Sequence, residues 1–141
     1  MKTKRLLAVA LVAFALALWP GCKTATPASL ERRVQIIAQL GAGEALFEHK
    51  DWKDEFELAA ADLRIIEAGD TVNIAQVVAI VQRLPVKELQ SPRGKLYVAT
   101  GLLLIMEAGV PSELDPDTSA GVKAVARGLR IGIENAIAYT Q

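Results

Sequence analysis

The stretch "DWKDEFELAAADLRIIEAG", residues 51–69, decides the fold class. Asp51 is placed to cap a helix, and Asp54 and Glu55 fall in its first turn, where the helix dipole favours acidic side chains. Gly69 fits the left-handed residue that commonly ends a helix. The stretch predicts an amphipathic helix whose buried face, spaced at threes and fours, consists of Trp52, Phe56, Ala59, Leu63 and Ile66.

Four other segments carry helical periodicity or helix start and stop signals. Ser29 fits an N-cap, Pro85 halts a helix, and Ser91-Pro92 begins another, since proline suits the first helical position. We expect these helices at about 29–48, 72–84, 92–109 and 119–139. In the first of them, one apolar face is formed by Leu30, Val34, Ile37 and Leu40 or Gly41.

The composition agrees with an all-α protein. Only 5% of the residues are aromatic although 52% are hydrophobic, whereas sandwiches and barrels favour Thr, Tyr and Phe. Between Leu96 and Met106 nearly every side of the expected helix is apolar, so we expect it at the centre. A chain of 141 residues is enough for one domain. We therefore predict a small bundle of about five helices over residues 29–141.

The N-terminus, "MKTKRLLAVALVAFALALWPGC" (residues 1–22), has a basic start and an apolar run from Leu6 to Trp19. As a helix these 14 residues rise only about 21 Å, against roughly 30 Å of bilayer hydrocarbon. The run is therefore too short for a permanent span and is typical of a secretory signal. Pro20 and Gly21 break the helix and leave extended backbone where a peptidase can cut.

"LWPGC" (residues 18–22) resembles the lipobox of bacterial lipoproteins, in which a small residue precedes an obligatory cysteine. The resemblance covers residues 1–22 only. It implies that the Cys22 sulfur carries diacylglycerol, that the signal is cut between Gly21 and Cys22, and that the freed amine then receives a fatty acid such as palmitate. Two alternatives stay open: an uncleaved signal anchor, or a free thiol left by cleavage after Ala15-Leu16-Ala17.

The resemblance also implies a location in the bacterial cell envelope. Lys23 follows the cysteine, and the absence of Asp there implies sorting to the outer membrane, facing the periplasm, if the source is Gram-negative. The organisation is then a signal peptide (1–21), a lipidated N-terminus with a short linker (22–28) and a helical domain (29–141). The seven residues "KTATPAS" after Cys22 span at most about 25 Å, so partners lie at or near the membrane surface.

The charge of the body argues against nucleic acid as a partner. The chain has 16 basic and 16 acidic residues, and no acid precedes Glu31. Removing residues 1–21 takes away three cations and leaves 13 basic against 16 acidic residues, a net charge of −3. Nucleic-acid binders usually carry a basic surplus.

Two surfaces are candidates for contacts. In "AQLGAGEA" (residues 38–45), Gly41, Ala42 and Ala45 form a possible partner patch. Glycines such as Gly41 and Gly43 weaken a helix, and close approach of a neighbouring helix explains their presence. A small-molecule contact and a local break of the helix are the alternatives.

The 119–139 helix is expected to turn five apolar residues towards the core: Val122, Val125, Leu129, Ile133 and Ala136. Its opposite face could meet anionic headgroups, or be a solvated face with an Arg130–Glu134 pair; its cations are Lys123, Arg127 and Arg130.

The sequence shows no signature of catalysis. The densest polar cluster straddles a predicted turn, where solubility and capping account for it; it consists of Glu44, Glu48, His49, Asp51, Asp54 and Glu55. No metal-ligand spacing, phosphate loop, dinucleotide fingerprint or nucleophile elbow occurs, so we expect no enzyme, metal or cofactor. The expected function is a membrane-anchored, non-catalytic binding or structural module with a protein partner in the envelope. The alternatives are a carrier of a small apolar ligand between helices and, less favoured, a hydrolase.

Overall fold

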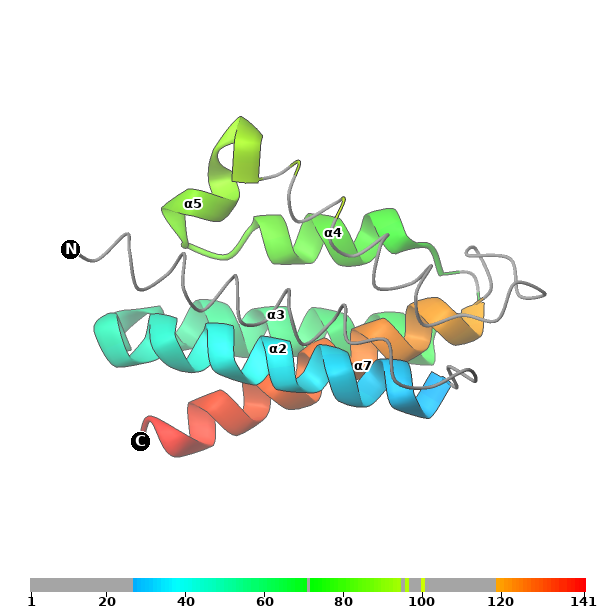
Figure 1. Cartoon of the computed structure of the whole chain (residues 1–141), viewed down its shortest axis with the longest axis horizontal. Coiled ribbons are helices and arrows are strands. Elements are labelled where there is room, and N and C mark those ends of the chain that lie inside the picture. Colours follow the sequence, from blue (N-terminus) through cyan, green and yellow to red (C-terminus); the bar gives the residue numbers. More distant parts are fainter. Residues whose placement is uncertain (1–26, 71, 95, 97–99, 101–118) are drawn as a thin grey trace.

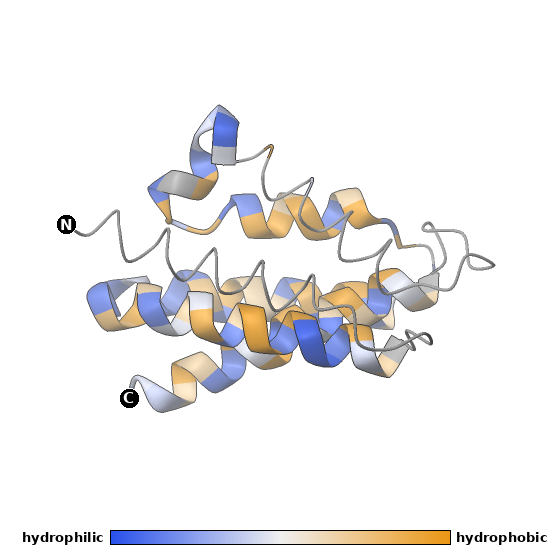
Figure 2. Ribbon diagram, viewed as in Figure 1, coloured by the Kyte–Doolittle hydropathy of each residue, from blue (hydrophilic) through white to orange (hydrophobic). Residues whose placement is uncertain are grey.

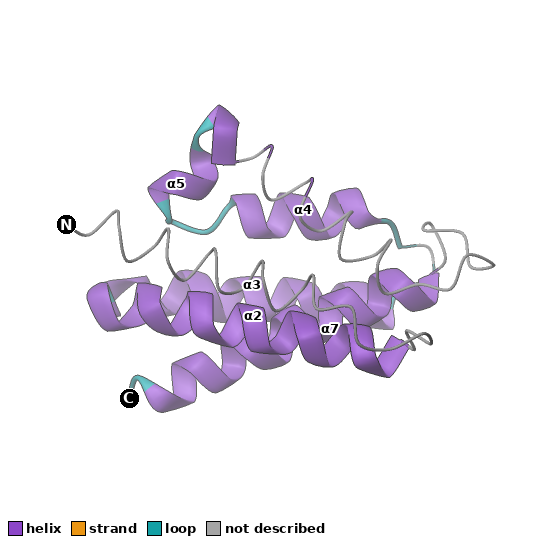
Figure 3. Ribbon diagram, viewed as in Figure 1, coloured by secondary structure: helices purple, strands orange, loops and turns teal. Residues whose placement is uncertain are grey.

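The computed structural model describes residues 27–70, 72–94, 96, 100 and 119–141. This part of the chain is helical without a strand, which confirms the predicted all-α fold (Figure 3). Its elements are α2 (Pro27–Glu48), the 3-10 turn η1 (Lys50–Trp52), α3 (Lys53–Ala68), α4 (Ile74–Gln82), α5 (Lys87–Gln90) and α7 (Ser119–Tyr139).

Helix α7 is the element that joins the bundle. It packs along much of α2, lies against α3 as well, and touches α4, which rests mainly on α3 (Figure 1). Gly128 of α7 lies beside Val34 and Gly132 beside Ala38, so α2 and α7 run parallel. Helix α3 runs in the opposite direction to α2, and α7 lies between the two (Figure 1).

Two glycines of α7 let the α2 and α7 backbones approach closely. A Cβ placed on Gly132 would lie 2.5 Å from the Gln35 carbonyl oxygen and 2.7 Å from the Ala38 Cβ. A Cβ on Gly128 would likewise meet the Val34 Cβ, at 2.9 Å. Any larger residue at either position would therefore collide with backbone atoms of α2, which cannot turn aside as a flexible side chain can.

The core is lined by the faces that α2, α3 and α7 turn towards one another. The predicted faces of α3 and α7 are confirmed: Phe56, Leu63, Val122 and Val125 are at most 2% exposed, and Leu129 is partly buried against the core. In α2, Leu30 and Val34 are buried as expected and Ile37 is partly buried, but Leu40 is 46% exposed and Gly41 is exposed too, so neither of these two belongs to that face. Helix α4 is apolar along most of its length (Figure 2) and buries Val77 and Ile80.

The ends of the predicted helices need correction. Helix α2 begins at Pro27, ahead of Ser29. Asp51 lies inside η1, and Trp52 occupies the N-cap of α3. Gly69 is not left-handed: its φ of −72° and ψ of 151° are extended backbone, which any residue adopts.

The segments after α3 differ in a similar way. Helix α4 begins at Ile74 rather than Val72, because Asn73 and Gln76 form a capping box. The short helix α5 was not expected. Ser91 Oγ accepts a hydrogen bond from the Gly94 N–H at 3.0 Å, and 92–94 are helical, in agreement with the predicted helix start. Leu96 is 63% exposed, and most of the expected central segment from Leu96 to Met106 lies outside the described residues.

Candidate functional surfaces

The proposed small-residue patch on α2 is divided between surface and core. Gly41 is exposed, Ala42 is 6% exposed within the core, and Ala45 packs against the core. Among the residues that the structure describes, a Cβ on Gly41 or Gly43 would meet nothing within 4 Å, so none of the described helices makes the expected close approach there. The alternative of a local break is also wrong, because α2 is continuous from Pro27 to Glu48.

Helix α2 instead presents an apolar stripe on its outer side, which we call the α2 outer face. It consists of Ile36 (43% exposed), Leu40 (46%), Gly43 and Phe47 (64%). The spacing of four, three and four residues puts them on one side of a helix. Sequence reasoning missed this face because α2 has a second apolar stripe facing the core, and periodicity alone does not say which of two stripes is buried.

Helix α3 also carries large apolar residues on its outer side. Leu58 is 61% and Ile65 is 70% exposed, seven residues apart and therefore on the same side of the helix. Helices α2 and α3 both pack against α7, and each turns these residues away from the core. The described surface therefore has two separate outward apolar stripes.

The cations of α7 take part in an ion-pair network within the molecule. Glu67, whose side chain is only 12% exposed, accepts hydrogen bonds from Arg130 Nε at 2.5 Å and Arg127 Nε at 3.5 Å. Arg130 also pairs with Glu134 at 2.8 Å, as predicted for that spacing, and Arg64 of α3 reaches the same carboxylate at 2.7 Å. The hydrogen bond from Arg130 to Glu67 raises the pKa of the guanidinium, and burial only partly opposes this.

The network ties three helices together. Arg127 reaches Glu31 of α2 at 3.7 Å as well as Glu67 of α3, so one α7 side chain faces acids on both neighbours. Much of the charge proposed for anionic headgroups is thus balanced by acids of the bundle. The expectation of headgroup contacts at Lys123, Arg127 and Arg130 stays a prediction.

The polar cluster near the α2–α3 junction has a structural arrangement. His49 stacks on Trp52 with ring centroids 3.9 Å apart and planes inclined by 16°. Within the described residues, no three His, Cys, Asp or Glu side chains are grouped to hold a metal ion. An open, shallow pocket lies at this end of the bundle, lined by Leu46, Lys50, Lys53, Thr140 and Gln141.

In the part of the chain described here, no helix combines the length and the apolar run needed to cross a bilayer. Comparison with protein-family models, with curated proteins and with solved structures finds no match to this chain.

Proposed function

We propose that the protein is a lipid-anchored component of the bacterial envelope, held at the membrane surface through Cys22, and that it works there as a non-catalytic binding or structural module. The observation that carries the proposal is the lipobox-like "LWPGC" (residues 18–22), which follows a basic start and an apolar run and contains the only cysteine of the chain. A lone cysteine next to a signal is suited to acyl attachment, because it has no second cysteine to bridge.

The folded part supports a role in binding. Large apolar side chains stand outward on α2 and α3, most exposed at Phe47 and Ile65. Contiguous exposed apolar surface on a soluble domain marks interaction sites more often than chemistry. Helix α2 begins only five residues after Cys22, so these surfaces are presented close to the bilayer.

The test compares the wild type with Cys22→Ser and, as a matched control in the linker, Thr24→Ala, all expressed in a bacterial host. We expect labelled palmitate to enter the wild type and Thr24→Ala but not Cys22→Ser. Mass spectrometry of the mature wild type should show an acylated N-terminal peptide beginning at Cys22. Equal masses and equal solubility of wild type and Cys22→Ser after signal removal would refute the lipid anchor.

A further inference from the structure

We infer that the α2 outer face lies on the lipid bilayer to which the protein is tethered, so that the anchor and this face together hold the bundle on its side. The inference rests on the proposed lipid anchor. At 100° per residue, Ile36, Leu40, Gly43 and Phe47 cover an arc of about 60°. From Ile36 to Phe47 the face extends about 17 Å along α2. This is the shape of a helix that lies in a membrane interface.

The short tether argues for the bilayer as the occupant of this face. Four residues separate Cys22 from Pro27, and the five steps from Cys22 to Pro27 span at most about 18 Å even when fully extended. The start of α2 therefore cannot leave the membrane surface by more than this distance. When α2 lies along the surface, its outer face meets the interface without stretching the connection.

The charges around the face agree with this orientation. Arg32 and Arg33 lie about 50° to either side of its centre, at the end nearest the anchor. Neither makes an ion pair with another described residue, whereas Glu31, on the inner side, faces Arg127. Arginine can extend its apolar stem over the face while its guanidinium reaches anionic headgroups. Glu44 lies further round, on the Arg33 side and away from the anchor.

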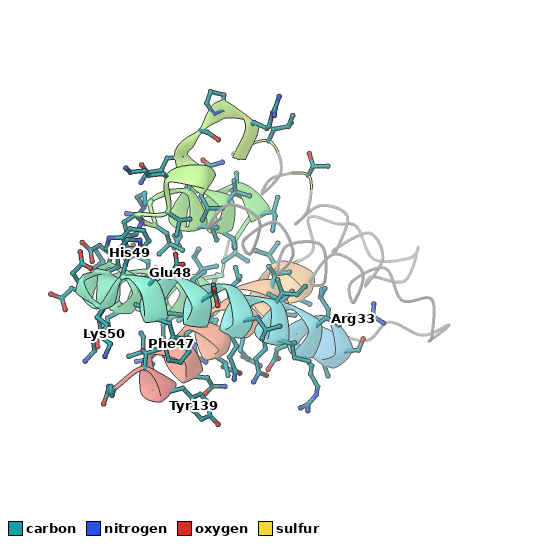
Figure 4. The ribbon with its side chains drawn as sticks, turned by 60° about the vertical axis from the view of Figure 1, so that its left-hand side comes forward. Arg33, Phe47, Glu48, His49, Lys50 and Tyr139 are labelled. Carbon is teal, nitrogen blue, oxygen red and sulfur yellow. The ribbon has the colours of Figure 1, made fainter. Side chains whose placement is uncertain are left out.

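The far end of the face carries aromatic side chains. Phe47 of α2 is 64% and Tyr139 of α7 is 75% exposed, and Figure 4 shows both at the same end of the bundle. The ring of tyrosine is apolar and its hydroxyl is polar, which suits the level of the headgroups. The face thus has arginines at the end nearest the anchor and Phe47 at the other end, with Tyr139 exposed at the end of α7.

The tether also compensates for the small apolar area of the α2 outer face. Three partly exposed apolar side chains bury too little area to bind a membrane stably from free solution. A short linker, however, makes the contact intramolecular, with an effective concentration in the millimolar range. The tethered α2 outer face can therefore rest on the bilayer, although its affinity is too low to bring an untethered protein to the membrane.

The test uses the acylated full-length protein with one reporter cysteine. Because Cys22 is occupied by lipid, Leu40→Cys supplies a single free thiol for an environment-sensitive dye on the α2 outer face. Leu58→Cys is the matched control: a leucine, exposed on a helix, on the outer side of α3. Both proteins are reconstituted in phosphatidylcholine vesicles with or without brominated acyl chains. Circular dichroism checks that each variant keeps the helical fold.

We expect brominated lipid to reduce the emission at position 40 roughly by half, and to leave that at position 58 nearly unchanged, since quenching requires contact with the acyl region. Equal quenching at the two positions, or none at position 40, would overturn the inference. So would a blue-shifted signal at position 40 that brominated lipid leaves unchanged and that fades on dilution with lipid, because it identifies a second copy as the occupant.

The same samples separate this inference from the proposed function. Mass spectrometry of the N-terminal peptide reports acylation of Cys22 independently of the dye. A protein without acyl chains would contradict the lipid anchor and this orientation together. An acylated protein whose position 40 stays in water would contradict the orientation alone.

Discussion

At the scale of single residues, four glycines that all lie inside long helices differ in their surroundings. Gly41 and Gly43 stand in the middle of α2, where a methyl group would meet no other described residue within 4 Å. Gly128 and Gly132 stand in α7 at positions where a methyl group would collide with α2. A helical glycine costs up to about 1 kcal/mol relative to alanine, so only the second pair has a packing reason for that cost.

This difference predicts opposite effects of the same substitution. Gly132→Ala should lower the free energy of unfolding by about 1–3 kcal/mol, because the new Cβ forces the two backbones apart. Gly43→Ala is the matched control and should raise it by up to about 1 kcal/mol. Urea denaturation followed by circular dichroism measures both. Equal stability of the two variants would contradict the close approach of α2 and α7.

At the scale of elements, α4 is a short helix that begins with a capping box. It has nine residues, and isolated helices of this length are marginal in water. Asn73 Oδ1 accepts from the Gln76 N–H at 3.1 Å, and Gln76 Oε1 accepts from the Asn73 N–H at 3.0 Å. The capping box therefore satisfies donors at the first turn that the helix itself cannot pair.

Asn73→Ala should weaken α4 by about 1 kcal/mol through the loss of this cap. Hydrogen exchange read by mass spectrometry should show faster exchange in α4 and unchanged exchange in α7. Asn73→Ser should retain most of the protection, since serine is also a strong N-cap. If exchange in α4 is the same in all three proteins, the cap does not stabilise this helix.

Helix α4 also shows which features can be predicted from the sequence and which cannot. The existence of a helix between Val72 and Pro85 was predictable from its apolar periodicity and the proline after it. Its predicted start is two residues early because the apolar pattern can be extended back to Val72, whereas the Asn73–Gln76 capping box starts the helix at Ile74. Helix α5, with four residues, is too short to have a periodicity.

At the scale of the whole molecule, the Glu67 carboxylate links helices that are far apart in sequence. It forms ion pairs with Arg130 and Arg127, whose side chains are 16% and 50% exposed. The raised pKa of Arg130 means that the folded state favours its charged form. This stabilisation is complete at every pH below the ordinary arginine range and is lost only in strong alkali, so arginine titration leaves stability unchanged near neutrality.

Glu67→Gln should lower the free energy of unfolding by about 1–3 kcal/mol, because it takes the less exposed of two carboxylate partners from a largely buried guanidinium and leaves only Glu134. The matched control is Glu57→Gln, which removes the exposed Lys53–Glu57 pair at 3.5 Å and should cost no more than about 0.5 kcal/mol. Thermal unfolding compares the two. A Glu67→Gln protein as stable as the control would show that the network contributes little.

The chain by itself determined the helical class, the approximate place of most helices and the buried faces of α3 and α7, because these depend on local periodicity and on helix-ending residues. It also carries the linear motifs from which a signal and an anchor at Cys22 are predicted. Only the tertiary structure decided which stripe of α2 is buried, which glycines are packing positions and which acids neutralise the arginines of α7. Each of these depends on contacts between residues distant in sequence, and such contacts leave no local pattern.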